Sequence, residues 1–254
     1  MGSRLLSISD LTVQFGGLTA LSNVHIDLHP GEVVGLIGPN GAGKTTLFNA
    51  LCGLAPVASG SLAVHDKNID WPKTHQLADL SISRTLQGVG LFPDLTVVEN
   101  VMVGGQKYAK GGVIRAAFGL DKKNEDFLRE KAMFALEKVY GTSIANLRAD
   151  SLPYPVTKRV AIARALMSDP KILLLDEPAG GLGSQDIEWM NALIRNLKVD
   201  TSILIVEHHM DVVMNVCDRI YVLNFGQLIA EGTPAEVRNN PEVIAAYLGA
   251  EAAQ

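Results

Sequence analysis

The residues best suited to chemistry form one glycine-rich segment, Gly38-Pro39-Asn40-Gly41-Ala42-Gly43-Lys44-Thr45. It matches the phosphate-loop pattern G-x-x-x-x-G-K-[ST], in which glycines let the backbone bend so that successive N–H groups converge on phosphate oxygens. Lys44 would reach the β- and γ-phosphates of ATP, and the hydroxyl of Thr45 would face Mg²⁺. Thr46 follows in the first turn of the expected helix, whose positive end points at the same anion. A glycine-rich turn matched by chance is the alternative, and the flanking strand and helix patterns argue against it.

A second reactive set is the acidic pair Asp176 and Glu177, which ends the apolar run Ile172 to Leu175. The pair would emerge at the carboxyl edge of a parallel sheet, where nucleotides bind. Asp176 suits a contact with Mg²⁺ through water, and Glu177 is placed to polarise an attacking water as general base. An acidic pair that only caps the next turn is the alternative, which the upstream phosphate loop disfavours.

Short apolar runs would position these residues. Glu32 to Ile37 leads into the phosphate loop, and Lys44 to Leu54 has the apolar spacing of a helix. Ile172 to Leu175, Ile203 to Val206 and Ile220 to Leu223 are continuous apolar runs, typical of strands covered on both faces in a parallel sheet. Helical patterns separate them, which predicts a doubly wound α/β core.

Two further regions complete the predicted fold. Leu5 to Phe15 and Val24 to Leu28 have the mixed pattern of half-exposed antiparallel strands, so a small β-layer leads the chain. Between Gly88 and Leu166 the short apolar runs give way to turn residues and to stretches with helical spacing, such as Asn124 to Tyr140. The prediction is one domain over 1–254: a P-loop NTPase (RecA-like) core with an N-terminal antiparallel β-layer and an inserted helical subdomain at approximately 88–166.

Composition narrows the function classes. The 254 residues carry 27 acidic and 22 basic side chains, a net charge of -5, with no long block of one sign. A nucleic-acid partner, which favours a basic face, is therefore not expected. No stretch approaches the ~20 consecutive apolar residues that span a bilayer, and the first residues lack the pattern of a secretory signal. We expect a cytoplasmic protein.

With the phosphate loop, the apolar strand and the acidic pair on one chain, the sequence resembles an ABC transporter ATPase subunit over nearly its whole length. Arg84-Thr85-Leu86-Gln87, followed by Thr96-Val97-Val98-Glu99-Asn100, looks like the Q-loop region of that family. The resemblance implies that Gln87 contacts Mg²⁺ and the attacking water, and that its loop senses a membrane partner. The alternative is that Gln87 is an ordinary loop glutamine. Its position between the phosphate loop and the acidic pair, in the order that the family has, favours the functional role.

Two more positions carry a role by the same resemblance. Val206-Glu207-His208 matches the switch histidine of the family, so His208 would contact the γ-phosphate, and His209 would be a bystander. Phe15 occupies the position where the family stacks an aromatic ring on adenine. A strand-end histidine and a core aromatic are the alternatives for these two residues.

The signature segment departs from the family pattern. Where the family has L-S-G-G-Q, this chain has Leu152-Pro153-Tyr154-Pro155-Val156, and Gly183 stands where the next loop normally has Asp or Asn. Pro153 and Pro155 have no N–H to donate to a phosphate. In the family, both regions act on the opposite subunit of an ATPase dimer, so a heterodimer with one strong and one weak site is favoured. The alternative is a Pro-Tyr-Pro turn that still closes adequately.

The carboxyl-terminal segment Gly226 to Val237, the run Pro241 to Gly249 and the segment Phe15 to Leu21 look like the branch that serves branched-chain amino-acid importers. That resemblance implies two membrane-spanning permease subunits, a second ATPase subunit and an external solute-binding protein, with this chain peripheral at the cytoplasmic face. Urea, short amides and other small polar solutes are alternative cargoes. A lipopolysaccharide-type export ATPase and a weakly hydrolytic nucleotide-gated regulatory subunit are the alternative functions. Soluble ABC ATPases that act on nucleic acid or ribosomes usually need more than 254 residues.

Overall fold

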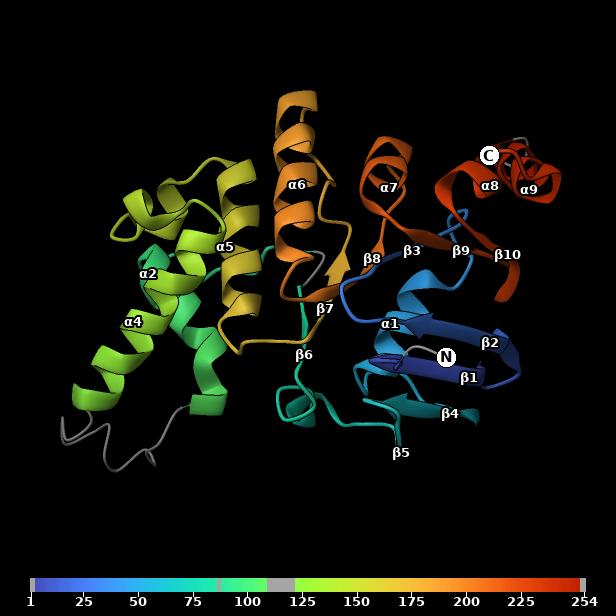
Figure 1. Ribbon diagram of the computed structural model, residues 1–254, viewed down its shortest axis with the longest axis horizontal. Helices are drawn as coiled ribbons and strands as arrows, with labels where there is room; N and C mark the ends of the chain where they lie inside the picture. Colours follow the sequence, from blue (N-terminus) through green and yellow to red (C-terminus); the bar gives the residue numbers. More distant parts are fainter. Residues whose placement is uncertain (1–2, 86–87, 109–121, 252–254) are drawn as a thin grey trace.

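The computed structural model describes residues 3–85, 88–108 and 122–251, with side chains as far as residue 248. Two β-sheets and the helices around them form the molecule (Figure 1). One sheet has six strands in the order β10-β9-β3-β8-β7-β6, and the other has four in the order β2-β1-β4-β5. The predicted α/β fold class, with an antiparallel layer beside a parallel core, is confirmed.

The six-stranded sheet places the reactive segments at one edge. Its strands β9, β3, β8, β7 and β6 are parallel, and β10 pairs with β9 in the antiparallel sense. Every residue of β3, β7 and β8 is buried, as their continuous apolar sequences predict. The strands are β3 (Val33–Ile37), β6 (Ile82–Arg84), β7 (Ile172–Asp176), β8 (Ser202–Val206), β9 (Arg219–Asn224) and β10 (Gln227–Gly232). Because β3, β7 and β8 are parallel neighbours, the segments that follow them meet at the same edge of the sheet.

The alternation of side chains along β3 shows how the core is divided. Val33 and Ile37 belong to one apolar cluster, and Val34 and Leu36 belong to another on the opposite face of the sheet. Successive side chains of a strand point to opposite faces, so one strand serves both clusters. The phosphate loop after Ile37 is therefore anchored in apolar packing on two sides.

The antiparallel sheet and helix α1 cover one of these faces. Leu47 and Phe48 of α1 pack in the same apolar cluster as Leu6, Leu21 and Leu62 of that sheet. The elements are β1 (Leu6–Phe15), β2 (Leu18–Leu28), β4 (Ser59–Val64), β5 (Lys67–Ile69), α1 (Lys44–Leu51) and the 3₁₀ turn η1 (Thr74–Gln76). The hairpin β1–β2 carries Phe15 to the same side of the molecule as the phosphate loop.

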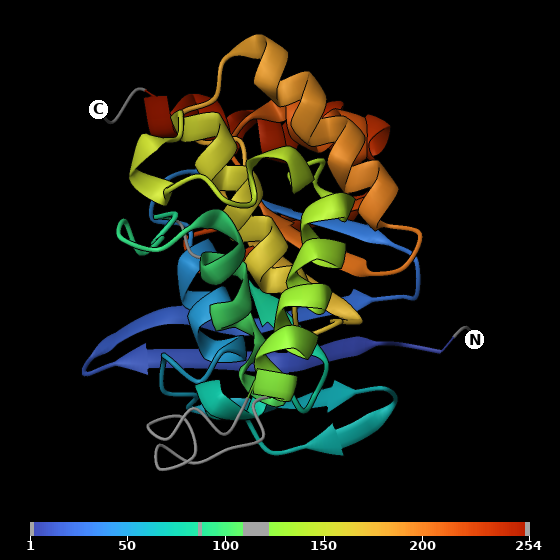
Figure 2. The same ribbon diagram turned by 90° about the vertical axis from the view of Figure 1, so that its left-hand side faces the viewer.

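Helices cover the other face of the central sheet. They are α5 (Tyr154–Leu166), α6 (Ser184–Leu197), α7 (Met210–Val216), α8 (Pro234–Arg238) and α9 (Pro241–Glu251). α5 also contacts α2 (Val97–Met102) and α4 (Lys122–Lys138), and the three lie side by side in Figure 2. The 3₁₀ segment η2 (Val103–Tyr108) directly follows α2, and η3 (Thr142–Ile144) and η4 (Ala149–Ser151) lie between α4 and α5. The division of approximately 88–166 as a separate helical subdomain stays a prediction.

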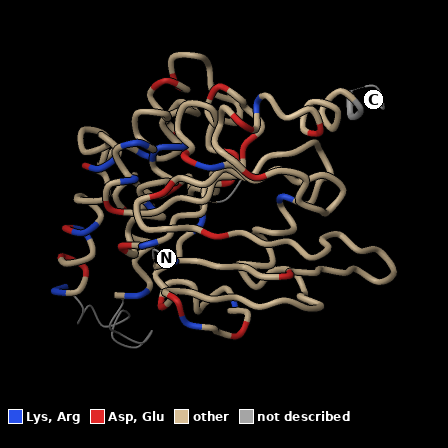
Figure 3. Tube along the Cα trace, turned by 45° about the vertical axis from the view of Figure 1, so that its right-hand side comes forward, with Lys and Arg blue, Asp and Glu red and all other residues tan. Residues whose placement is uncertain are grey.

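Two properties of the described residues bear on the composition, the distribution of charged residues and the hydropathy of the helices. Lysine and arginine are intermixed with aspartate and glutamate along the trace (Figure 3). Among the helices in the described ranges, none combines the length and the hydropathy that a membrane span requires.

Candidate nucleotide site

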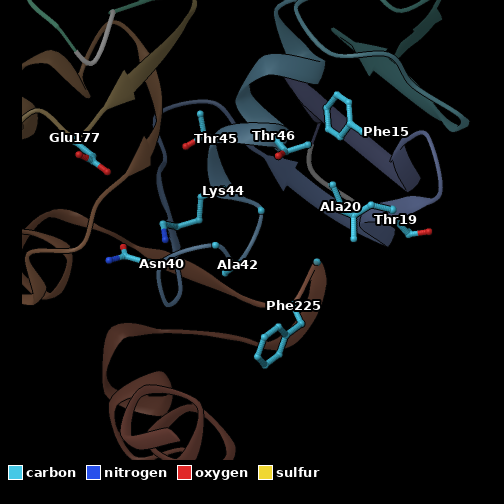
Figure 4. A pocket seen from close by; sticks show the side chains of 14 residues that line it. Phe15, Thr19, Ala20, Asn40, Ala42, Lys44, Thr45, Thr46, Glu177 and Phe225 are labelled. Carbon is cyan, nitrogen blue, oxygen red and sulfur yellow. The ribbon is translucent and has the colours of Figure 1, made fainter. Parts of the chain in front are cut away.

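A cavity of about 600 Å³ opens where the phosphate loop, the β1–β2 hairpin and the β9–β10 hairpin meet. Figure 4 shows Glu177 at one end of it, Phe15 at the other, and Lys44 and Thr45 between them. The lining residues are Phe15, Leu18, Thr19, Ala20, Asn40, Gly41, Ala42, Gly43, Lys44, Thr45, Thr46, Glu177, Phe225 and Gly226. A carboxylate at one end, a basic loop in the middle and aromatic rings beyond it suit an elongated ligand with a phosphate chain and a ring system.

Two glycines of the phosphate loop are required by its geometry. Gly38 has φ +149°, and a Cβ there would lie 2.0 Å from the carbonyl oxygen of Leu223. Gly43 has φ +107° and precedes α1, which begins at Lys44. Both backbone conformations are ones that only glycine adopts readily. The loop between β3 and α1 can therefore curl tightly enough to present its N–H groups to an anion.

The side chain of Lys44 folds back onto the phosphate loop. Its side chain is largely buried, and Nζ donates to the carbonyl oxygens of Gly38 at 2.7 Å and Pro39 at 2.8 Å. Burial lowers the pKa of Lys44, and the negative charge of Glu177 opposes that shift. Gly38 and Pro39 do not line the cavity, so they contribute by holding the ammonium group in place.

Asp176 ends β7 and is paired with an arginine. Its Oδ2 accepts from Nη2 of Arg84 at 2.7 Å, and its N–H donates to Oγ1 of Thr85. Arg84 also donates to Oδ1 of Asn49 at 2.9 Å. Burial leaves Asp176 about 3% exposed, and it does not line the cavity, whereas Thr45 does.

This donor set fits Mg²⁺. The cation prefers oxygen ligands and keeps several waters. Thr45 offers a hydroxyl inside the cavity, and the buried position of Asp176 suits a contact through water better than a direct one. The predicted metal residue Gln87 lies outside the described residues.

Glu177 has an unusual backbone that is fixed from three directions. Its φ is +46°, its N–H donates to the carbonyl oxygen of Val206 at 2.9 Å, and its carbonyl oxygen accepts from the N–H of Gly180 at 3.1 Å and Nζ of Lys158 at 2.9 Å. Nδ1 of His208 lies 3.9 Å from Oε1 of Glu177. The structure thus brings together the expected general base and the expected switch histidine, although His208 does not line the cavity.

Glu207 connects these two segments, and the sequence reasoning assigned it no role. Its carboxylate is fully buried; Oε1 accepts the N–H of Ala179 at 2.7 Å, and Oε2 accepts the N–H groups of His208 and His209 at 2.9 and 3.0 Å. The ring of His209, expected to be a bystander, also lies 2.9 Å from Oε2 through Nδ1. A glutamate that directly follows an apolar strand and precedes the switch histidine was the available signal.

The distal end of the cavity has two aromatic rings. Phe15 at the end of β1 is 47% exposed and lines the cavity, and its contact with a nucleobase stays a prediction. Phe225, which the sequence reasoning missed, is 89% exposed in the two-residue turn between β9 and β10. An aromatic residue before Gly226 in a tight hairpin, where Asn is preferred, was the signal that could have identified it.

The Pro-Tyr-Pro segment forms the first turn of α5. Pro153 is the N-cap and makes no side-chain cap, and Tyr154 and Pro155 follow it. The N–H of Val156 donates to the carbonyl oxygen of Pro153 at 2.9 Å. With two prolines and this internal bond, the turn has few N–H groups to offer an anion.

Comparison with known proteins agrees with this geometry. The family model for ABC transporters matches residues 21–180, and the model for branched-chain amino acid ATP-binding cassette transporters matches residues 227–253. The high-affinity branched-chain amino acid transport ATP-binding protein LivG of Escherichia coli K12 is 41% identical over 98% of this chain and 99% of its own length. The lipopolysaccharide export system ATP-binding protein LptB of Haemophilus influenzae is 32% identical over 96% of this chain and 97% of its own.

The solved structures that this chain resembles are also ATP-binding cassettes of ABC transporters. The ADP conformation of an ATP-binding cassette of an ABC transporter superposes with a TM-score of 0.83 at 31% identity, over 97% of this chain and 99% of that one. A dimeric bacterial ABC transporter cassette superposes with a TM-score of 0.74 at 26% identity, over 90% of this chain and 98% of that one.

Proposed function

The chain belongs to the ABC transporter family of ATP-binding cassettes, and from this premise we propose that it energises the uptake of branched-chain amino acids or a similar small polar solute. It is an ATPase subunit whose hydrolysis is coupled to transport. In the proposed assembly it lies peripherally at the cytoplasmic face, against membrane-spanning permease subunits that receive solute from an external binding protein. The lipopolysaccharide-export alternative is less favoured because that relative is 32% identical, against 41% for the amino-acid transport relative.

The observation that carries the ATP-hydrolysing part of the proposal is the order of groups along the cavity from Glu177 to Phe15, and the solute class rests on the relatives. Phe15 stacks on the nucleobase, the loop N–H groups bind the phosphate chain, and Lys44 leaves its carbonyl partners to bind the β- and γ-phosphates. Mg²⁺ held by the hydroxyl of Thr45, and by Asp176 through water, would neutralise charge on the phosphates.

At the other end, Glu177 accepts the proton of the attacking water, and His208 contacts the γ-phosphate from the neighbouring strand end. Their side chains already lie 3.9 Å apart. Gln87 is proposed as the third group that contacts the water and the metal.

The partner ATPase is proposed to be a different chain. Each site of an ABC dimer combines one subunit's phosphate loop with the other subunit's signature segment. The first turn of α5 here has Pro153 and Pro155 where N–H donors are needed, which supports one weak site opposite the partner's nucleotide. The phosphate loop of this chain would meet the intact signature of the partner, so its own nucleotide would be hydrolysed.

The test is steady-state ATP hydrolysis by the purified chain alone and mixed with the second ATPase subunit, with Glu177→Gln as the matched variant. Low activity alone, a clear rise with the second subunit and loss of activity in the Glu177→Gln mixture are expected. Equal and robust activity of the chain alone would refute the heterodimer. No activity in any mixture, with ATP still bound, would favour the nucleotide-gated regulatory subunit instead.

A further inference from the structure

A lysine of helix α5 contacts the backbone of the loop that follows β7 and begins with Glu177. Lys158 is 7% exposed, and its Nζ donates to the carbonyl oxygen of Glu177 at 2.9 Å. The N–H of Gly180 donates to the same oxygen at 3.1 Å. A lysine side chain is rarely buried without a specific partner, and here the partner is the main chain of the expected general base.

The backbone that Lys158 contacts is strained. Glu177 has φ +46°, a left-handed conformation that is sterically unfavourable for a residue with a side chain. Such conformations persist only where the surroundings hold them, and they concentrate at functional sites. The hydrogen bonds to Glu177 come from three separate elements: Val206 of β8, Gly180 of the loop and Lys158 of α5. Because the Cα–Cβ direction follows the backbone, these bonds also set the direction in which the side chain of Glu177 leaves the main chain.

A second side chain of α5 contacts the same loop. Tyr154 lies four residues before Lys158 and therefore on the same face of the helix, and Nζ of Lys158 is 5.5 Å from the centre of its ring. A Cβ on Gly181 would lie 3.0 Å from Cε1 of Tyr154, so the ring packs directly on that glycine. The first two turns of α5 thus lie against the loop 177–181 of their own chain.

We propose that Lys158 is a positioning residue for Glu177: it holds the carbonyl oxygen of Glu177 and so keeps the carboxylate directed into the cavity. The inference rests on the proposed role of Glu177 as general base.

The test compares Lys158→Met and Lys158→Arg with the unmodified chain, in the assembly that hydrolyses ATP. Lys158→Met keeps most of the aliphatic stem and removes the donor, so kcat is expected to fall at least ten-fold while KM for ATP stays within two-fold. Lys158→Arg keeps a donor and is expected to recover part of kcat. Lys138→Met, which removes a lysine of α4 paired with Asp200, is the control for the loss of one charge.

A double variant separates positioning from general damage. If Lys158 acts through Glu177, Lys158→Met adds no further loss to the residual activity of Glu177→Gln. A further ten-fold loss in that background, or an unchanged kcat in Lys158→Met alone, would overturn the inference. If Glu177→Gln itself keeps the activity of the unmodified chain, the proposed role of Glu177 fails, and this result is distinct from a failure of Lys158 alone.

Discussion

Oε1 of Glu207 accepts the backbone N–H of Ala179 at 2.7 Å, and this bond joins the segment that carries His208 to the loop that carries Glu177. The two residues are 28 positions apart in sequence. The other oxygen of Glu207 accepts the N–H groups of His208 and His209. Together with the bond from the N–H of Glu177 to the carbonyl oxygen of Val206, this buried carboxylate sets the relative positions of the expected general base and the expected switch histidine.

Replacing this carboxylate tests how far the site depends on it. Glu207→Gln keeps the size of the side chain but turns one acceptor oxygen into an NH₂ group that faces N–H donors. Leaving a buried group unsatisfied costs about 1–3 kcal/mol, so the free energy of unfolding is expected to fall by that amount, and kcat is expected to fall with it. Denaturant unfolding and ATPase rates measure the two effects. Glu188→Gln on the exposed side of α6 is the control, and equal stability of the two variants would contradict the prediction.

The buried pair Arg84–Asp176 gives a second prediction. The side chains are 11% and 3% exposed, and their contact is 2.7 Å. Removing one partner of a buried pair leaves an uncompensated charge and costs about 3–5 kcal/mol, so Arg84→Met is expected to be strongly destabilised. Adding Asp176→Asn should restore part of that loss. A double-mutant cycle in denaturant unfolding measures the coupling, and strictly additive losses would show that the pair does not act as a unit.

Lys44 predicts a pH dependence of the nucleotide-free protein. Burial lowers its pKa in the folded state below the ordinary value of 10.5. Between these two values the unfolded chain binds more protons than the folded chain, so the free energy of unfolding rises with pH in that window. Below the lowered pKa both states are protonated and the slope vanishes. Lys44→Met removes this contribution.

The Lys44 experiment compares denaturant unfolding of the two proteins at increasing pH up to 10.5. The stability of the unmodified chain relative to Lys44→Met is expected to increase across the window. A difference that stays constant with pH, or that decreases, would contradict the prediction.

Phe225 lies at a position of the β9–β10 turn where the backbone conformation favours Asn. Its φ of +43° and that of +77° at Gly226 are typical of a two-residue turn in which Asn-Gly is preferred. Phe225→Asn is therefore expected to increase the free energy of unfolding by about 1 kcal/mol, since Asn tolerates this conformation better. Phe225→Ala removes the same ring without relieving the backbone and serves as the matched control.

The two Phe225 variants also test whether the ring meets the ligand. If it contacts the nucleobase, both lower the affinity for ATP, and both leave the affinity for inorganic tripolyphosphate unchanged. Isothermal titration of the two ligands measures this. Unchanged ATP affinity in both variants would leave Phe15 as the aromatic ring that serves the base.

The sequence alone determined the parts of this protein that depend on short-range patterns. The phosphate loop, the buried strands β3, β7 and β8, and the acidic pair at the end of β7 could all be predicted, because glycine positions, apolar runs and turn residues constrain the backbone within a few positions. Resemblance to the family then added Phe15 and His208, which were identified by their positions relative to the motifs of the family.

Only the tertiary structure decided which side chains hold those residues in place. Arg84 on Asp176, Glu207 on Ala179 and Lys158 on Glu177 join residues 92, 28 and 19 positions apart. These contacts depend on strand order and on how α5 packs against the central sheet. No local pattern encodes them, because hydrogen bonding and burial at one residue are set by neighbours that the chain brings together only when it folds.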